Sequence, residues 1–246
     1  MPAEVEPICP TFMLNKCTHC DARGSGVCEA VPEDGLTRLS AAATALSFEP
    51  AQRFITEGDK AEHFFVISAG TAKLLKMLPD GRQQIVSFCG PGDFLGLSVF
   101  SLYSYGAEAV EPVRLCRFSR FTLRCLMTDF PAMERRLLKS ATFELTLAQE
   151  QMLLLGRKNA RERLASFLIA RARATGTCPA RGRPAVPPQV ALPMNRTDIG
   201  DFLGLRIETV SRTMTALKTD GIIEILPRCG VIIRDFDALE SLAACI

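Results

Sequence analysis

Short apolar stretches broken by glycine run through the chain from about residue 46 to residue 118. Examples are Phe64-Phe65-Val66-Ile67 and Ile85-Val86-Ser87-Phe88. The dipeptide Asp80-Gly81 separates two alternating runs, which is a strong signal for a β-hairpin. Many short strands with regular turns are typical of an antiparallel roll or barrel. We therefore predict an antiparallel β-roll in a sensor domain at residues 36–131, within an α+β protein.

Residues 132–158 contain no Gly or Pro until Gly156 and predict one long helix. Two stripes follow helical spacing along it. The first is wholly apolar: Leu138, Ala141, Leu145, Ala148, Met152 and Leu155. The second is mixed: Arg136, Ser140, Phe143, Leu147, Glu150 and Leu154. A helix that is apolar on two sides is usually covered on both.

The simplest arrangement packs one side of this helix on the roll and the other on the same helix of a second copy, in a parallel dimer. We place the dimer interface on the mixed stripe. Glu150 would then approach its own mate across the twofold axis, where two carboxylates repel in a low dielectric. The alternative is a helix sandwiched inside a single monomer.

A shorter helix is predicted at about residues 159–174, followed by a Pro/Gly-rich connector at 175–193 that we interpret as an exposed loop. A compact helical segment comes next. Two apolar strands around a turn at residues 227–230 then form a small hairpin, or wing. We assign residues 159–246 to one C-terminal domain.

The segment from Asn195 to Leu217 predicts two helices joined by a turn at Gly204. Thr197 is suited to N-cap the first helix, and the second begins near Arg206. Val210, Met214 and Leu217 form the buried stripe of the second helix. Its opposite, outward face carries Ile207, Glu208, Ser211 and Arg212. Helix, glycine turn, helix and wing together form a winged helix-turn-helix.

The outward side chains suit the base edges of double-stranded DNA. Arg212 can donate twice to guanine, and Glu208 can accept from cytosine. Ser211 can bond a base edge or a phosphate, and Ile207 can pack on a thymine methyl. We add Arg196 and Thr197, at the start of the first helix, to the predicted DNA-binding residues. The alternative is that Glu208 and Arg212 form only a weak surface pair four residues apart.

Charge is unevenly distributed along the chain. Residues 1–156 hold 15 Lys/Arg against 18 Asp/Glu, whereas residues 157–246 hold 14 against 9. A basic C-terminal third fits a polyanionic partner, although a solvated basic surface would look the same. The chain has no apolar run long enough to span a membrane and no secretory signal, so we expect a cytoplasmic protein.

Ten cysteines are present, and four of them lie in the first thirty residues. Cys17, Cys20 and Cys28 follow the spacing Cys-x2-Cys-x7-Cys, with Cys9 before them and His19 between. In a reducing compartment such clusters favour metal or redox roles over structural disulfides. We therefore predict a cysteine-bearing arm at residues 1–35 that holds a metal or an iron–sulfur cluster.

Three segments resemble the Crp/Fnr superfamily of transcriptional regulators, in particular its Fnr branch. Residues 200–212 resemble its helix-turn-helix, residues 153–164 the end of its dimerisation helix, and Gly92-Asp93-Phe94-Leu95-Gly96 a turn of its cyclic-nucleotide-binding-like roll. The resemblance implies a homodimer that binds a twofold-symmetric operator with half-sites similar to TTGAT. It also implies a contact with RNA polymerase, for which the hairpin at Asp80-Gly81-Arg82 is a candidate.

The same resemblance indicates which ligand the sensor domain binds. Cyclic-nucleotide binders of the family carry Gly-Glu after the roll turn and an Arg further on, whereas Leu97 and Ser98 follow Gly96 here and no Arg precedes Arg114. We therefore expect no cyclic nucleotide. The arm resembles that of oxygen-sensing Fnr-type regulators, which implies a 4Fe–4S cluster on Cys17, Cys20 and Cys28, with Cys116 as the fourth ligand.

The residues alone would not choose Cys116 over Cys89 or Cys125. Arg114, Arg117 and Arg120 are expected to lower the pKa of nearby thiols. Alternatives are a structural zinc, a thiol–disulfide switch, haem, or an iron–sulfur electron carrier with an incidental basic domain. We do not expect an enzyme, because the sequence shows no nucleophile–base set, Walker loop or dinucleotide fingerprint.

Overall fold

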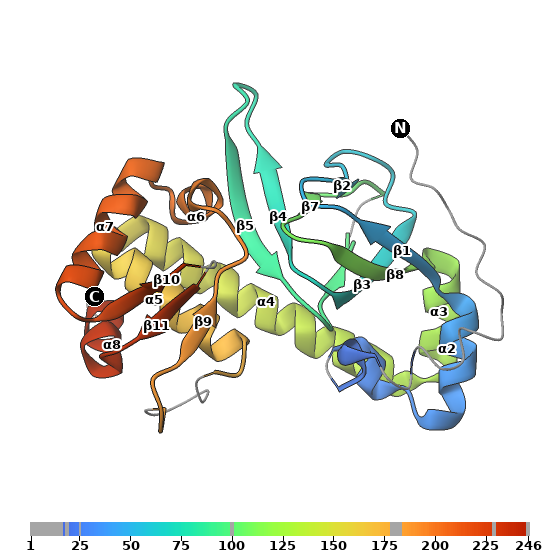
Figure 1. Ribbon diagram of the computed structural model, residues 1–246. Coiled ribbons are helices and arrows are strands. Elements are labelled where there is room, and N and C mark those ends of the chain that lie inside the picture. Colours follow the sequence, from blue (N-terminus) through green and yellow to red (C-terminus); the bar gives the residue numbers. More distant parts are fainter. Residues whose placement is uncertain are drawn as a thin grey trace. The chain divides into compact units, whose positions relative to one another are not determined.

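The computed structural model describes residues 17, 20–24, 26–98, 101–177, 184–227 and 230–244 (Figure 1). The chain divides into two compact units, Met1–Thr146 and Leu147–Ile246. Cys9, His19, Cys178, Cys229 and Cys245 lie outside the described residues. In the described ranges, no helix has both the length and the apolar character needed to cross a membrane.

Two four-stranded antiparallel sheets form the roll of the first unit, which confirms the predicted fold of this domain. One sheet has the order β1-β8-β3-β6 and the other β2-β7-β4-β5. The strands are β1 (Thr44–Phe48), β2 (Arg53–Ile55), β3 (His63–Ala69), β4 (Ala72–Met77), β5 (Gln83–Cys89), β6 (Phe94–Leu95), β7 (Gly106–Ala109) and β8 (Val113–Ser119). β4 and β5 form the hairpin predicted around Asp80-Gly81.

Strand β3 serves two cores because its side chains alternate between the faces of the sheet. Phe65 and Ile67 point into the interior between the two sheets. Phe64 and Val66 point to the outer face, where a second core forms. Helical segments cover this face: η1 (Asp21–Gly24), η2 (Val27–Ala30), η3 (Glu33–Gly35), α2 (Leu36–Ala42), α3 (Arg120–Asp129) and the first turns of α4 (Pro131–Arg157).

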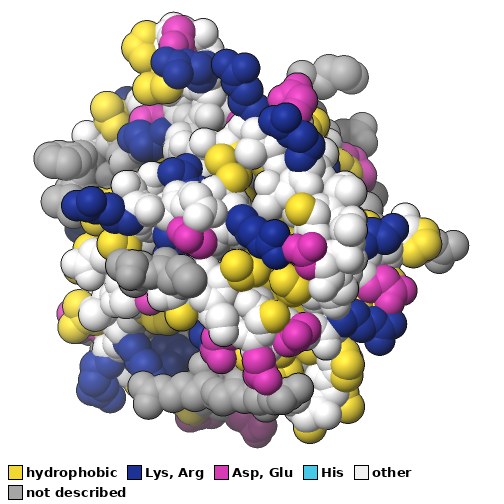
Figure 2. Space-filling model, turned by 90° about the vertical axis from the view of Figure 1, so that its left-hand side faces the viewer, with side chains coloured by type: hydrophobic (Ala, Val, Ile, Leu, Met, Phe, Trp, Pro, Cys, Tyr) yellow, Lys and Arg dark blue, Asp and Glu magenta, His cyan; other side chains and the backbone are white. Residues whose placement is uncertain are grey.

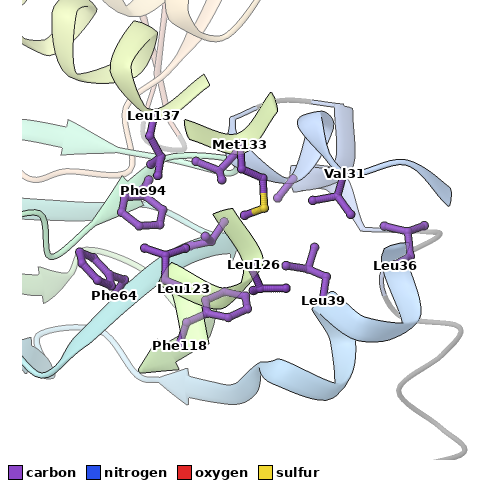
Figure 3. Close-up of a cluster of buried hydrophobic side chains, with 13 residues drawn as sticks. Val31, Leu36, Leu39, Phe64, Phe94, Phe118, Leu123, Leu126, Met133 and Leu137 are labelled. Atoms are coloured by element: carbon purple, nitrogen blue, oxygen red, sulfur yellow. The ribbon is translucent and has the colours of Figure 1, made fainter. Parts of the chain in front are cut away.

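The outer core brings the cysteine-bearing arm into contact with α3 and α4. Leu39 of α2, Leu126 of α3 and Met133 of α4 all belong to it, together with Phe118 of β8 (Figure 3). Each large side chain buried here contributes about 1.5–3 kcal/mol relative to exposure. The arm is therefore packed onto the roll from Ala22 onward, which its weak periodicity did not predict.

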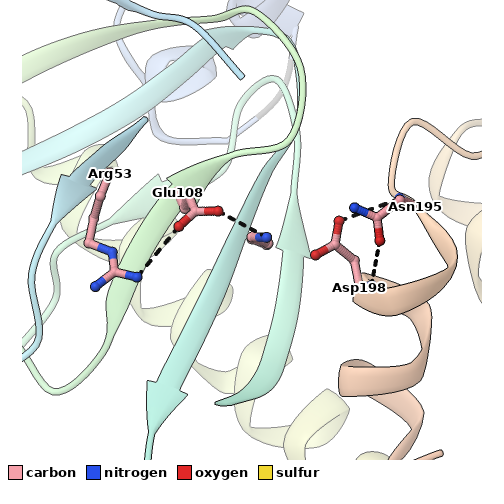
Figure 4. Close-up of polar contacts among 5 residues, drawn as sticks. Arg53, Glu108, Asn195 and Asp198 are labelled. Atoms are coloured by element: carbon pink, nitrogen blue, oxygen red, sulfur yellow. Dashed lines mark hydrogen bonds and ion pairs between the residues drawn. The ribbon is translucent and has the colours of Figure 1, made fainter. Parts of the chain in front are cut away.

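A charged group lies across the second sheet of the roll. Glu108 of β7 forms ion pairs with Arg53 of β2 at 3.5 Å and with Lys73 of β4 at 3.0 Å (Figure 4). Lys73 is only 8% exposed. A buried ammonium needs such a partner, because an unpaired charge there would cost several kcal/mol, on the order of 3–5.

The predicted long helix is confirmed as α4. Its Met133 and Leu137 are buried in the outer core. Within the first unit, the wholly apolar stripe does not pack on the roll, since Leu138 and Leu145 are 70% and 58% exposed. Met152, in the second unit, is 65% exposed. The expectation that one of the two predicted stripes covers the roll is therefore wrong. A third row of residues, between those stripes, faces the roll.

The second unit contains the predicted winged helix-turn-helix. Its elements are α5 (Ala160–Ala174), β9 (Gln189–Ala191), α6 (Arg196–Leu203), α7 (Ile207–Thr219), β10 (Ile223–Leu226), β11 (Gly230–Ile233) and α8 (Phe236–Ala244). β10 and β11 form the predicted wing. β9 pairs with β11 inside the segment predicted as a loop, and only Val190 of β9 is buried, a pattern too short to predict a strand.

Candidate functional site

The helix-turn-helix is built from α6 and α7. Asn195, not Thr197, caps α6: its Oδ1 accepts from the Asp198 amide at 2.8 Å, and Asp198 returns a contact to the Asn195 amide (Figure 4). The prediction for Thr197 is wrong because the helix begins at Arg196, two residues earlier than a Thr197 cap requires. Gly204 ends α6 with a left-handed φ of 63°, which favours glycine.

The inward and outward faces of α7 are as predicted. Val210, Met214 and Leu217 are at most 1% exposed, which anchors the helix. Ile207, Glu208, Ser211 and Arg212 are all exposed. Among the described residues no ion pair joins Glu208 to Arg212, so both side chains are available to bases. In Figure 1, α7 lies on the left, the side that faces the viewer in Figure 2, where Lys and Arg are spread among Asp and Glu.

The two residues predicted at the start of α6 differ in environment. Thr197 is exposed and can reach a phosphate. Arg196 is half-buried, and burial lowers the pKa of its guanidinium. One buried guanidinium nitrogen of Arg196, Nη1, has no hydrogen-bond partner within the described part of the chain. Most buried donors in native proteins have a partner, so this unpaired nitrogen is an exception that its burial makes costly.

Cys17, Cys20, Cys28 and Cys116 line a single pocket at the edge of the outer core. Three come from the arm, and Cys116 lies on β8, opposite Ala45 of β1 and Val66 of β3. The rest of the wall is mainly apolar: Ala22, Arg23, Leu36, Leu39, Ala43, Val66, Ser68 and Phe118. Cys89 is buried in the interior between the sheets, and Cys125 is exposed on α3. The structure thus brings together the three cysteines of the spaced motif and Cys116, the fourth residue that the family resemblance implied.

The thiols of the pocket influence one another. Burial, followed by the nearby Cys116, Cys20 and Cys17, raises the pKa of Cys28 to about 12. Burial also raises the pKa of Cys17. Arg23 opposes both shifts, and it donates to the Cys28 carbonyl at 2.6 Å. The thiols of Cys17 and Cys28 are therefore protonated in the free chain, and ligation would have to displace their protons.

The expectation that Arg114, Arg117 and Arg120 lower the thiol pKa values is wrong for Cys17 and Cys28. Arg23 is the cation that acts on both thiols. Arg120 instead donates to the carbonyls of Ala61 and Ser98 and lies over the Phe64 ring. These contacts hold the guanidinium of Arg120, which is the first residue of α3.

Four cysteine thiolates are the donor set of a 4Fe–4S cluster, so the residues present fit that group. In the described ranges, no three His, Cys, Asp or Glu side chains are arranged to hold a single metal ion. The shared pocket and the donor chemistry of the four cysteines therefore support a ligand set.

Arg136 connects the loop between Cys20 and Cys28 to α4. Its Nε donates to the Gly26 carbonyl at 3.0 Å, and its Nη2 lies 2.8 Å from Glu29 Oε2. Gly26 has a φ of 65°, and a Cβ there would lie 1.8 Å from the Gly92 carbonyl oxygen. The loop is thus held between a turn of the roll and the helix. Arg136, predicted in the dimer interface, points to the arm of its own chain.

The remaining predicted interface residues fall into two groups. Phe143 and Leu147 are 63% and 43% exposed, and Glu150 is exposed beside them. Ser140 is half-buried, and Leu154 is only 8% exposed. The middle of the mixed stripe is therefore open to a partner, whereas its two ends are engaged within the chain.

Two domain families match this chain. Residues 45–129 match the cyclic nucleotide-binding domain, and residues 162–242 match the Crp-like helix-turn-helix domain. They correspond to the roll with α3 and to the helix-turn-helix with its wing.

Relatives match over nearly the whole length. The transcriptional activatory protein AadR of Rhodopseudomonas palustris is 39% identical over 231 residues, which cover 92% of each chain. The transcriptional activator protein FnrL of Cereibacter sphaeroides is 36% identical over 94% of this chain and 92% of its own. The solved structure of FixK2 from Bradyrhizobium japonicum covers 83% of this chain and 98% of its own, with 34% identity and a TM-score of 0.73. Roll, long helix and winged helix-turn-helix recur in this order, and the chain belongs to the Crp/Fnr family of DNA-binding transcriptional regulators.

Proposed function

We propose that this protein is an oxygen-responsive transcriptional activator, in which a 4Fe–4S cluster on Cys17, Cys20, Cys28 and Cys116 controls dimerisation and operator binding. The observation that carries the proposal is the shared pocket of these four thiols, which lie up to 99 positions apart in sequence. AadR and FnrL, both named as transcriptional activators, support the direction of regulation. A structural zinc or a simple thiol switch on the same residues is the competing hypothesis.

The chain's residues would transmit the signal in two steps. A bound cluster would supply an oxygen-sensitive link between the arm and β8. Arg136 couples the arm to α4, because it binds the Gly26 carbonyl between Cys20 and Cys28 and the Glu29 carboxylate that directly follows Cys28. Phe143, Leu147 and Glu150 of α4 then meet their mates in a homodimer. There the paired Glu150 carboxylates make the dimer weak enough to depend on the arm.

The roll matches the cyclic nucleotide-binding domain, but we propose a different signal for it. At the roll turn, Leu97 and Ser98 stand where a cyclic phosphate would need its carboxylate partner. The Gly96 amide is already donating to Tyr105 Oη at 2.8 Å. Addition of a 3′,5′-cyclic nucleotide should leave DNA binding unchanged.

In the dimer, each α7 would enter the major groove of one half-site similar to TTGAT. Arg212 and Glu208 would contact bases, and Thr197 and Arg196 would contact phosphates. The hairpin of β4 and β5 would contact RNA polymerase. Its exposed Met77 and Leu78 lie beside the Asp80–Arg82 ion pair, giving an apolar surface with a charged edge.

The test is anaerobic purification followed by absorption and Mössbauer spectroscopy, with iron and sulfide assays, before and after exposure to air. We expect about four iron and four sulfide per chain, lost or converted in air, together with loss of dimer and of operator binding. A colourless protein with one zinc per chain would overturn the proposal. A cluster that survives air without any change in DNA binding would indicate an electron carrier instead.

Matched variants assign the ligands. Cys116→Ala should abolish the cluster, whereas Cys89→Ala and Cys125→Ala should retain it, because neither residue lines the pocket. Retention of a full cluster in Cys116→Ala would remove that residue from the ligand set.

A further inference from the structure

The junction between α4, α5 and the helix-turn-helix is held by one guanidinium. Arg163, in the first turn of α5, donates to three backbone carbonyls: Nη2 to Leu155 at 2.8 Å, Nε to Lys158 at 2.8 Å and Nη1 to Leu203 at 2.9 Å. Leu155 lies in the last turns of α4, and Leu203 is the last residue of α6. One side chain therefore joins three segments.

Each acceptor is a group that a helix end leaves free. The last four carbonyls of a helix have no partner within it, and their partial negative charge attracts a cation. Gln151 of α4 supplies a fourth bond of this kind, from its Nε2 to the Phe202 carbonyl at 2.7 Å. The end of α6 is thus capped from outside, by side chains of α4 and α5.

The turn of the helix-turn-helix packs closely at the same place. A Cβ on Gly204 would lie 3.3 Å from Leu155 Cδ2 and 3.4 Å from Arg163 Nη1. Asn159 starts α5 with a capping box that includes Glu162, so the base from which Arg163 extends is itself ordered. The junction between α4 and α5 therefore contacts the turn before α7 and fixes its position.

We propose that Arg163, assisted by Gln151, is a positioning residue that sets the direction of the recognition helix α7 relative to the last turns of α4. In a dimer joined along α4, that direction fixes the distance between the two recognition helices. Arg163 would thereby select the spacing of the two half-sites without contacting DNA. This inference goes beyond the proposed sensing mechanism, and rests only on its dimer and its palindromic operator.

The three hydrogen bonds at position 163 require the planar guanidinium of arginine. Three donors in one planar fork reach three acceptors on different segments, whereas a lysine ammonium is a compact group on a flexible stem. Arg163→Lys keeps the charge and loses the fork. Arg157→Lys is the matched control, since Arg157 is an exposed residue at the end of α4.

The experiment uses full-length, cluster-loaded protein and duplexes with two TTGAT half-sites. One duplex has the preferred spacing, and others have one base pair more or fewer. We expect Arg163→Lys to bind the preferred duplex about tenfold more weakly, which is about 1.4 kcal/mol, and the altered duplexes nearly as well as wild type does. The preference for one spacing therefore shrinks, with the dimer intact. Gln151→Ala should shift the preference the same way but less.

Four results would overturn the inference. Equal weakening on all spacings, with a lower melting temperature, would mean a purely structural role. A decrease of about one in the slope of log affinity against log salt concentration would mean that Arg163 contacts a phosphate. Unchanged spacing preference in both variants would mean that the junction has no such role. If wild type itself fails to bind any of these duplexes, the proposed operator is wrong, and the inference falls with it.

Discussion

Arg136 of α4 donates to the carbonyl oxygen of Gly26, 110 positions earlier in the chain, at 3.0 Å. The bond joins the cysteine loop to the helix on which the proposed dimer depends. A charge-assisted hydrogen bond of this type contributes about 1.5–3 kcal/mol, whereas an exposed ion pair such as Arg136–Glu29 contributes about 0–1 kcal/mol. The carbonyl contact should therefore dominate the coupling.

Arg136→Gln is expected to release the loop. Amide hydrogen exchange across residues 26–30 should accelerate, and operator affinity of the cluster-loaded protein should fall about tenfold, which corresponds to a lost charge-assisted bond. Glu29→Gln should change affinity by no more than about threefold. Arg135→Gln, an exposed neighbour, serves as the control. Unaltered exchange at 26–30 together with a lost dimer would return Arg136 to the intermolecular interface.

Gly26→Ala tests the other side of the same loop. Its φ of 65° and the nearby Gly92 carbonyl leave no room for a Cβ, so we expect the loop to leave its place and cluster assembly to fail. The roll should remain folded by circular dichroism. Gly24→Ala is matched, because a Cβ at Gly24 meets nothing within 4 Å. If Gly26→Ala assembles a wild-type cluster, the loop is not held as described.

Much of the fold could be predicted because its signals are local. Asp80-Gly81 marks the β4–β5 hairpin, and Val210, Met214 and Leu217 give α7 one buried face. The order of the roll's strands depends on contacts between distant segments, which a single sequence does not encode in any local pattern. Strand β9 has three residues and pairs with β11, where Val231 lies opposite Val190 from 41 positions later in the chain.

The candidate site shows the same division. The spacing of Cys17, Cys20 and Cys28 is local, and it was visible in the sequence. The approach of Cys116 to them depends on how β8 pairs with β1 and β3. Arg136 and Gly26 are separated in sequence by all the strands of the roll. The helical spacing that placed Arg136 on the mixed stripe did not predict their contact. Such long-range pairs need the folded chain.

Phe143→Glu should abolish dimerisation of the cluster-loaded protein, because a charge would replace an exposed aromatic ring at the centre of the proposed interface. Leu145→Glu is the matched control: it has similar exposure and lies on the wholly apolar stripe. Sedimentation should show a monomer for the first variant and a dimer for the second. The reverse result would move the interface to the apolar stripe.

Arg212→Ala should weaken operator binding by about 1–3 kcal/mol and relax the preference for guanine at one position of each half-site. Thr197→Ala should instead weaken binding to all sequences alike, as expected for a phosphate contact. Competition assays with single base-pair substitutions separate the two effects. A uniform loss in Arg212→Ala would identify it as a phosphate contact.

Glu144 of α4 gives a prediction about pH. Burial, together with the nearby Asp93, raises the pKa of its carboxyl. When the pKa of a carboxyl is higher in the folded state than in the unfolded state, its protonated form stabilises the folded protein. This stabilisation is complete only below the unfolded-state pKa, about 4.3, and is lost as the pH rises through the folded-state pKa. At neutral pH the charged carboxylate of Glu144 therefore destabilises the folded protein. Glu144→Gln should therefore stabilise the protein slightly at pH 7, and the gain should vanish near pH 4. Denaturant unfolding at both pH values measures this difference. Glu134→Gln, on the same helix, is the control; equal stability of wild type and Glu144→Gln at pH 7 would show that burial and Asp93 do not act on Glu144.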